Sequence, residues 1–322
     1  MKLGIFTVLF GDKNLEEALD YIQSQGLETV EIGVGGYPGK KHADAATLIG
    51  DEQLLNTFKQ AVVSRGLEIS AISCHGNPLH PDAEVADAFH QDFLHAVLLA
   101  EKLGVETVIG FSGCPGESDS SKNPVWVTCA WPPEHVEVLE WQWKEKVIPY
   151  WKEMSQFMRE HGVRVAIEPH PGFVVYNTET ALRLREEAGD NIGVNFDPSH
   201  LYWQQMDPVE CIKELGKAKA IYHFHAKDTA FDTRNVAING VLDTKSYRDE
   251  LTRSWIFRTV GYGHGEEEWR RIISALQLIG YDGAISIEHE DSLMSIEEGF
   301  EKAVTFLKSI LIRQRIEQIW WA

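Results

Sequence analysis

Short apolar segments typical of strands alternate with longer helical segments along all 322 residues. In the helical segments apolar residues recur every three or four positions, as Leu15, Leu19 and Ile22 do between residues 15 and 25. The strand-like segments cover residues 3–9, 29–32, 67–73, 105–111, 163–167, 192–196, 221–226 and 284–287. Because a helix follows each strand, the strands should pair in parallel. Eight such α/β units predict a closed (β/α)8 TIM barrel.

The chain shows no linker that would separate a second domain, so we expect one barrel domain over residues 1–322. Two long loops, near residues 112–133 and 229–265, follow strands and should lie at the same end of the barrel. A C-terminal helix is predicted from Ile296 to about Ile319. It carries more apolar residues than one stripe needs, so it either covers the barrel wall or forms a subunit contact. We favour the contact and expect a homo-oligomer.

The net charge of -19 disfavours nucleic acids and anionic membrane surfaces, because binding to either depends on Lys and Arg. No apolar run approaches the ~20 residues that a membrane span needs. The four cysteines are scattered and form no CxxC pair, so neither a zinc ribbon nor a disulfide framework is predicted. A cytoplasmic enzyme with a small-molecule substrate is the expectation.

Polar side chains end four consecutive predicted strands. Side chains alternate between the two faces of a strand, and Glu168, Asp197, His225 and Glu288 each lie opposite branched or aromatic residues. The branched faces suit the helical layer, and the other faces suit the barrel lumen. Active sites of such barrels lie at the carboxyl ends of the strands. We therefore expect these four side chains to converge at the barrel mouth.

Three carboxylates and one imidazole form a mostly oxygen ligand set, which suits Mn²⁺, with Mg²⁺, Co²⁺ and Zn²⁺ as alternatives. Crowded carboxylates without a cation would repel one another, so the set itself argues for a divalent metal. His223 and His225 share one strand face. The alternative for this pair is two hydrogen-bonded core histidines without a metal.

Four motifs carry a family resemblance. They are Ile167-Glu168-Pro169-His170, Asn195-Phe196-Asp197-Pro198-Ser199-His200, His223-Phe224-His225-Ala226-Lys227-Asp228 and Ser286-Ile287-Glu288-His289. Together they resemble the xylose isomerase-like TIM barrel superfamily, and within it the sugar (phosphate) isomerase/epimerase group that includes ketose 3-epimerases and inosose dehydratases. The resemblance implies that the four residues above are the metal ligands and that His200 binds substrate.

The chain departs from the ketose 3-epimerases at two places. Their second substrate-binding Glu corresponds to Val174 here, and their Arg after the metal-binding His is displaced, with Arg234 and Arg258 as candidates. These departures weigh against a simple ketohexose epimerase. The His-x-His-x-Lys-Asp stretch is more similar to the dehydratases.

The predicted function is a metal-dependent sugar isomerase or epimerase that removes a proton beside a carbonyl through a metal-stabilised enediolate. Glu168 and Glu288 are the predicted catalytic carboxylates. A lyase on the same scaffold is the alternative, by dehydration of an inosose or by β-elimination from a 3-keto-sugar or its glycoside. An abasic-site endonuclease is disfavoured by the charge of -19.

The predicted substrate-binding residues are His75, His170, His200, Trp126 and Arg258. His75 has the alternative of a structural turn histidine, and Trp126 that of loop packing. No Gly-rich loop ends in the Gly-Lys-Ser/Thr of a P-loop, so a free sugar is favoured over a phosphorylated one.

Overall fold

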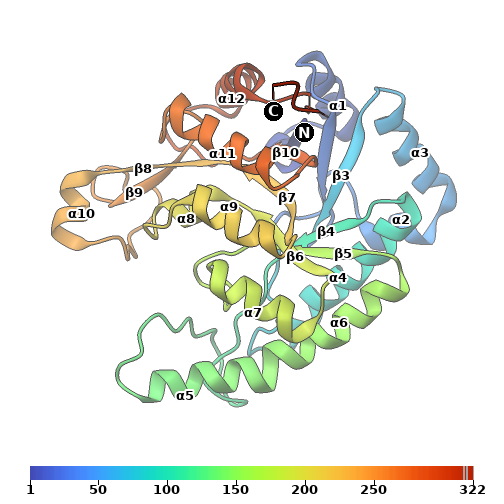
Figure 1. Ribbon diagram of the computed structural model, residues 1–322. Coiled ribbons are helices and arrows are strands. Elements are labelled where there is room, and N and C mark those ends of the chain that lie inside the picture. Colours follow the sequence, from blue (N-terminus) through green and yellow to red (C-terminus); the bar gives the residue numbers. More distant parts are fainter. Residues whose placement is uncertain (315, 317, 322) are drawn as a thin grey trace.

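Eight parallel strands close into a barrel in the computed structural model, which describes residues 1–314, 316 and 318–321 (Figure 1). The barrel strands are β1 (Lys2–Phe6), β2 (Thr29–Gly33), β3 (Glu68–Ser73), β4 (Thr107–Gly110), β5 (Arg164–Ile167), β6 (Ile192–Phe196), β7 (Ile221–Ala226) and β10 (Ala284–Ile287). Each strand pairs with the next along the chain, and β10 closes the barrel on β1. The predicted TIM barrel is therefore confirmed.

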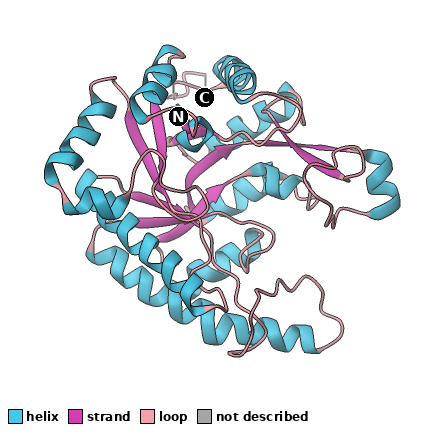
Figure 2. Cartoon of the chain, turned by 180° about the vertical axis from the view of Figure 1, so that it is seen from behind, coloured by secondary structure: helices cyan, strands magenta, loops and turns pink. Residues whose placement is uncertain are grey.

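Helices surround the barrel (Figure 2). They are α1 (Leu15–Ser24), α2 (Ala45–Gly50), α3 (Glu52–Val63), α4 (Ala83–Leu103), α5 (Glu134–Trp141), α6 (Ile148–Glu160), α7 (Thr178–Ala188), α8 (Pro198–Tyr202), α9 (Pro208–Lys217), α10 (Thr233–Asn239), α11 (Glu266–Leu278) and α12 (Ile296–Ile310). Capping side chains set several starts: Asn14 caps α1, Asp82 caps α4 and Asp207 caps α9. None of the helices in the described part of the chain combines the length and hydrophobicity that a membrane crossing requires.

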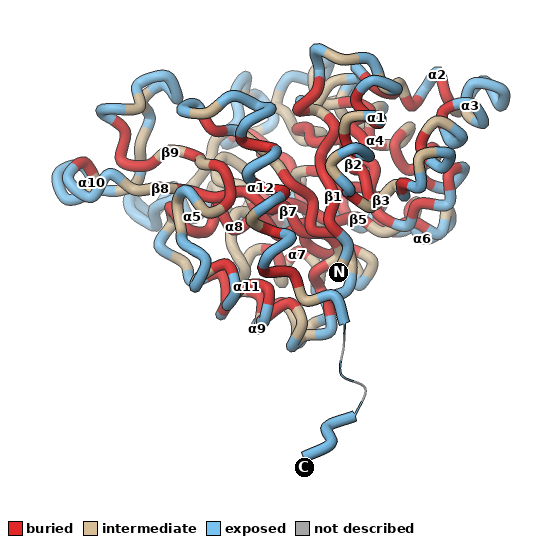
Figure 3. The backbone as a smooth tube through the Cα atoms, turned by 90° about the horizontal axis from the view of Figure 1, so that it is seen from above, coloured by how far each residue is buried: buried red, intermediate tan, exposed pale blue. Residues whose placement is uncertain are grey.

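Several predicted elements are shorter in the structure, among them the first strand and the last helix. β1 ends at Phe6, and residues 7–10 form a 3₁₀ turn instead of continuing the strand to Leu9. α12 ends at Ile310 and not near Ile319, and the last buried side chain of this segment is that of the next residue, Leu311. Beyond it Ile316, Ile319 and Trp320 are exposed, and residues 318–321 lie away from the barrel (Figure 3). The homo-oligomer stays a prediction.

The barrel strands separate an outer apolar core from a polar lumen. Val165, Val194 and Ile285 belong to the large core between strands and helices, as their alternation predicts. Ser286 and Asn195 face the lumen, where their side chains bond to acidic residues from other strands. The barrel strands are accordingly buried along nearly their whole length, as the red colour in Figure 3 shows.

Tyr222 does not share the outer face with Phe224, although residues 222 and 224 would lie on the same face of a regular strand. The pairing of β6 with β7 shifts register there, because Val194 faces Ile221 while the next residue, Asn195, faces His223. The extra residue turns Tyr222 inward, where it packs on a small cluster of lumen residues that includes Ala166. Its ring occupies the space beside Gly193, where a Cβ would lie 2.4 Å from Cδ2 of the ring.

The predicted second long loop contains a hairpin arm. After β7 the chain forms β8 (Asp228–Phe231), α10 and β9 (Trp255–Arg258), and the two strands pair antiparallel outside the barrel (Figure 1). Asp228 anchors the base of this arm, since its buried carboxylate accepts hydrogen bonds from Trp269 Nε1 and from backbone N–H groups that include Gly261 and His264.

The first long loop, which follows β4, is tied down by one buried amide. Gln142 lies in a π-helical turn (Gln142–Val147) between α5 and α6. Its Nε2 donates to the carbonyls of Pro115, Gly116 and Val125 at 3.2, 3.1 and 2.7 Å. π-turns inserted in helices often mark functional regions, and this one holds the loop at the barrel mouth.

Candidate metal centre and substrate pocket

The four predicted ligands meet at the mouth of the barrel. Glu168, Asp197 and Glu288 directly follow β5, β6 and β10, and His225 lies in β7. One donor atom from each of these residues lies within 4.8 Å of the other three. Because side chains alternate along a strand, each of these residues points into the lumen. The strands that carry them are neighbours in the barrel, so the four side chains lie close together.

Two donor atoms in this group are well placed to bind a cation. Asp197 Oδ2 and His225 Nδ1 are buried and lie next to ion-pair partners, Lys227 Nζ at 3.0 Å and Glu288 Oε2 at 3.1 Å, but neither forms a hydrogen bond of good geometry with a described residue. The other Asp197 oxygen is occupied, because Oδ1 caps α8 by accepting the Ser199 N–H at 2.8 Å. Buried polar atoms without partners are costly. The donor set therefore has the composition and spacing that a divalent metal site requires.

Glu168 lies among three imidazoles. His75 Nε2 is 3.1 Å from Oε2, His200 Nε2 is 3.2 Å from Oε1, and His225 Nδ1 is 3.3 Å from Oε2. Burial raises the pKa of this carboxyl, but the neighbouring imidazoles of His200, His225 and His75 outweigh this effect and leave the pKa well below its usual value. Asn195 Nδ2 also donates to Oε2 at 2.8 Å.

The sequence interpretation missed Glu31, a carboxylate in the barrel lumen. It lies in β2 and is fully buried. Its Oε2 accepts hydrogen bonds from His225 Nε2 and Ser286 Oγ, both at 2.8 Å, and its Oε1 bonds to Ser73 Oγ at 2.5 Å. An acid between Val30 and Ile32 inside a buried strand is itself a signal of this role, since isolated buried carboxylates are rare.

His223 and His225 have different surroundings, so each of the two interpretations, metal ligand and hydrogen-bonded core histidine, fits one member of the pair. His223 is held between Asn195 Oδ1 at 3.1 Å and Ser70 Oγ at 3.3 Å. Burial lowers the pKa of His223 to about 4, which keeps it neutral. It is a hydrogen-bonded core histidine, whereas His225 turns Nδ1 toward Glu168 and Glu288, at 3.3 and 3.1 Å.

Lys227 brings a buried cation to the edge of the cluster. Its side chain is almost fully buried, and Nζ lies 3.0 Å from Asp197 Oδ2 and 2.9 Å from Glu288 Oε2. Burial alone would lower its pKa, but the carboxylates of Asp197, Glu288 and Glu290 raise it well above the usual value. The ammonium offsets part of the negative charge that gathers here.

A pocket of about 490 Å³ opens above the cluster. Its lining consists of Phe6, Val8, Tyr37, Pro38, His75, Phe111, Glu168, His170, Phe173, His200, Lys227, Glu288 and Glu290. This volume lies in the range of small-molecule sites. Three predicted substrate-binding residues, His75, His170 and His200, line it. The rings of His170 and His200 lie 4.1 Å apart, and burial lowers the pKa of His170 well below its usual value.

The other two predicted substrate-binding residues do not line this pocket in the described structure. Trp126 packs with Trp203, Trp255 and Phe257 against β9 of the hairpin arm. Arg258 lies in β9, where its Nε donates to Asp291 Oδ2 at 3.0 Å. A role for either residue in substrate binding stays a prediction.

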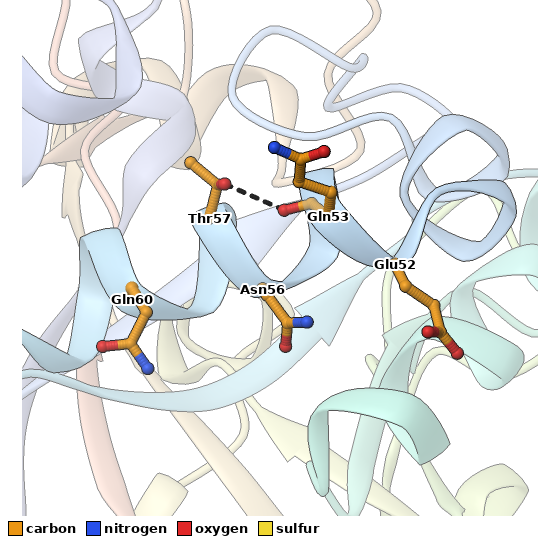
Figure 4. A pocket seen from close by; sticks show the side chains of 5 residues that line it. All are labelled: Glu52, Gln53, Asn56, Thr57 and Gln60. Carbon is orange, nitrogen blue, oxygen red and sulfur yellow. Dashed lines mark hydrogen bonds between the residues drawn. The ribbon is translucent and has the colours of Figure 1, made fainter.

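A separate, shallow hollow of about 600 Å³ lies on the outer face of α3, away from the metal pocket (Figure 4). It is lined by Glu52, Gln53, Asn56, Thr57 and Gln60. All five side chains come from exposed positions of one helix, and Thr57 Oγ1 bonds back to the Gln53 carbonyl (Figure 4). With a single carboxylate and no facing wall, this surface lacks the convergent groups of a catalytic site.

The fold is a TIM barrel, and the buried carboxylates and imidazole at its mouth form a candidate site for a divalent metal. The model of the xylose isomerase-like TIM barrel family matches residues 19–310, so the chain belongs to this family. Its amino-acid sequence is 36% identical to that of uncharacterized protein YfiH of Bacillus subtilis (strain 168), over 97% of this chain and 99% of YfiH.

Two further relatives have more specific names. Rhizopine catabolism protein MocC of Rhizobium meliloti is 27% identical, over 88% of this chain and 76% of MocC. The inosose dehydratase of Yersinia enterocolitica is 26% identical, over 69% of this chain and 68% of that enzyme.

Solved structures share the barrel. The IOLI protein with a bound zinc atom superposes with a TM-score of 0.64 at 18% identity, over 97% of this chain and 98% of IOLI. The 3-keto-D-glucoside 4-epimerase YcjR from E. coli gives 0.64 at 13% identity, over 96% and 99%. The D-psicose 3-epimerase of Clostridium cellulolyticum H10 gives 0.61 at 14% identity, over 97% and 99%. At these identities the likeness shows the fold.

Proposed function

We propose that this protein is a divalent-metal-dependent sugar isomerase or epimerase acting on a keto- or aldo-sugar. One observation carries the proposal: three carboxylates and one imidazole from neighbouring strand ends bring donor atoms within 4.8 Å of one another beside a pocket of sugar-ring dimensions. Mn²⁺ is the ion we expect, with Mg²⁺, Co²⁺ and Zn²⁺ as alternatives, because the donors are mostly oxygen.

Glu168 and Glu288 are the proposed proton-transfer groups. A divalent ion held by the four ligands would supply Lewis-acid stabilisation to an enediolate formed beside a sugar carbonyl. The two carboxylates leave β5 and β10, which are separated in the barrel by β6 and β7. They therefore approach a substrate from different directions, which allows a proton to leave one face of a carbon and return to the other.

Histidines orient the proposed base and the substrate. His75 and His200 each hold a different oxygen of Glu168, at 3.1 and 3.2 Å, which limits rotation of the carboxylate. His170, beside His200 in the pocket wall, is kept neutral by burial and can accept a hydrogen bond from a sugar hydroxyl. The pocket thus offers both uncharged and charged partners to a polyhydroxylated ligand.

A lyase is the second candidate, and the position of Lys227 favours it. Its ammonium lines the pocket 2.9 Å from Glu288. In an elimination a carboxylate takes the proton beside the carbonyl, the C–O bond on the next carbon breaks, and the ammonium protonates the departing oxygen. The likeness to an inosose dehydratase supports the same possibility.

Mass spectrometry after incubation in D₂O separates the two candidates. Mn²⁺-loaded protein is mixed with free ketoses, inososes and 3-keto-glycosides, and the products are analysed. An isomerase or epimerase gives an isomer that carries solvent deuterium, whereas a lyase gives loss of water or of an aglycone. Glu168→Gln should abolish both outcomes and Glu52→Gln, on the exposed face of α3, should change neither. Absence of any metal-dependent product or exchange would overturn the proposal.

A further inference from the structure

A second cavity adjoins the metal pocket on the side of the hairpin arm. It measures about 400 Å³ and is lined by His170, Tyr247, Ile256, Phe257, Glu290 and Ser292. His170 and Glu290 line the metal pocket as well. The two cavities therefore meet at this pair of residues, and a ligand bound over the metal centre can extend between them into the second cavity.

The aromatic wall of the second cavity comes from the arm, which extends from the barrel in Figure 1. The rings of Tyr247 and Phe257 lie nearly parallel, at 17° with centroids 5.8 Å apart. Phe257 also lies 4.8 Å from Lys227 Nζ and 5.3 Å from the His200 ring, so this wall begins at the metal pocket itself. Aromatic faces of this kind bind flat rings by stacking.

The arm holds this wall in a fixed position. Trp203 and Trp255 stack at 4.7 Å and 7°, and Trp126 packs against them from the first long loop. Arg253 is buried behind the wall, with its guanidinium 4.3 Å from the Tyr247 ring, and its Nε donates to the Trp255 carbonyl at 3.1 Å. A wall braced in this way is preorganised, so little ordering free energy is lost when a ligand binds.

The polar groups of the second cavity suit a linked, hydroxyl-bearing ligand. Glu290 accepts a hydrogen bond from Lys227 Nζ at 3.1 Å and has half of its side chain exposed, so part of the carboxylate remains available at the junction. Ser292 adds a hydroxyl from the same loop. A free monosaccharide would occupy only one of the two cavities and leave the aromatic wall without a partner.

We propose that the second cavity is a subsite for a second ring, and that the substrate is a glycoside or an oligosaccharide instead of a free monosaccharide. The inference rests on the proposed function, because it assumes that the reacting sugar lies over the four-ligand cluster. The second ring stacks on Tyr247 and Phe257, and the glycosidic linkage lies between His170 and Glu290.

Calorimetry on the Mn²⁺-loaded protein tests this with three ligands that share a first ring: methyl β-D-glucopyranoside, phenyl β-D-glucopyranoside and cellobiose. We expect at least one of the two-ring ligands to bind about tenfold tighter than the methyl glycoside, which corresponds to roughly 60 Å² of buried apolar area. Comparing the affinity for the phenyl glucoside with that for cellobiose shows whether the second ring is aromatic or a sugar. Equal affinities for all three ligands, or binding of none, would overturn the inference.

Two variants locate the effect. Ser292→Trp fills the second cavity, so the two-ring ligands should bind this variant no more tightly than the methyl glycoside does. Leu293→Trp, at the exposed neighbouring position, should leave the affinity for the two-ring ligands unchanged. Tyr247→Ala removes one ring of the wall without filling space and should give the same loss. A two-ring advantage that survives both Ser292→Trp and Tyr247→Ala would overturn the subsite. The proposed function is judged separately, by deuterium exchange into one-ring ketoses, which does not depend on this cavity.

Discussion

His225 Nε2 donates a hydrogen bond of 2.8 Å to Glu31 Oε2 across the barrel lumen. β7 and β2 are not neighbours, since β10 and β1 lie between them. Because a carboxylate can only accept, this bond assigns the proton to Nε2 and leaves Nδ1 turned toward Glu168 and Glu288. Carboxylates that hold metal-binding histidines in this way fix the ring and raise its basicity.

Replacing Glu31 should therefore weaken metal binding without removing a ligand. For Glu31→Gln we expect about a 10- to 100-fold loss of Mn²⁺ affinity, because an amide no longer holds the His225 ring and its tautomer as strongly. Titration calorimetry of the metal-free protein with Mn²⁺ measures this. Glu52→Gln is the matched control on the surface, and unchanged affinity in Glu31→Gln would show that His225 needs no such partner.

Lys227 should compete with the metal. Its ammonium lies 3.0 and 2.9 Å from oxygens of Asp197 and Glu288, two of the four candidate ligands. Lys227→Met removes this positive charge, so we expect Mn²⁺ affinity to rise by about tenfold or more. Turnover should fall in the same variant if the ammonium protonates a departing oxygen. A lower Mn²⁺ affinity would instead mean that Lys227 organises the carboxylates for the ion.

Gln142 should stabilise the loop after β4. In Gln142→Leu the carbonyls of Pro115, Gly116 and Val125 lose the Gln142 donor inside the protein. We expect a loss of about 1–3 kcal/mol in the free energy of unfolding, measured by urea denaturation. Gln156→Leu, at an exposed position of α6, provides the control and should stay within about 0.5 kcal/mol of the parent.

Gly193 makes room for the inward-turned Tyr222. A Cβ at position 193 would lie 2.4 Å from the Tyr222 ring, so Gly193→Ala should destabilise the protein by about 1–3 kcal/mol through overpacking. Gly50→Ala serves as the control, because nothing lies within 4 Å of a Cβ there. A Cβ at position 193 would also lie 2.6 Å from the Ala220 carbonyl oxygen, so combining Gly193→Ala with Tyr222→Ala should relieve only the part of the clash that the ring causes. A purely additive effect in thermal denaturation would argue against the contact with Tyr222.

Acid should loosen the hairpin arm through Asp243. Burial raises the pKa of this carboxyl, but Lys245 and the N–H groups of Lys245 and Ser254 lower it to about 2. A pKa below that of the unfolded chain means that the stabilisation is present above pH ~4 and is lost as the pH falls toward 2. The amide proton of Ser254, followed by NMR, should shift over this range, and Asp243→Asn should abolish that titration. A pH-independent shift in the parent would contradict the assignment.

Much of the architecture can be predicted from short segments of the sequence. Strand and helix periods in the chain predicted the eight barrel strands, and the bounds of β6 and β10 agree with the segments expected from residues 192–196 and 284–287. Alternation within single strands also predicted that Glu168, Asp197, His225 and Glu288 would come together, as they do. Each of those inferences needs only the residues of one segment and the parallel order of the strands.

The sequence by itself determined the barrel and the four residues at its mouth, because periodicity and side-chain parity are properties of a continuous segment. Only the tertiary structure decided that Glu31 faces His225, that Tyr222 turns inward at a register shift, and that residues 228–258 form an arm beside the pocket. The reason is physical. Contacts across a closed barrel depend on the stagger between strands far apart in the chain, and a local pattern carries no record of that stagger.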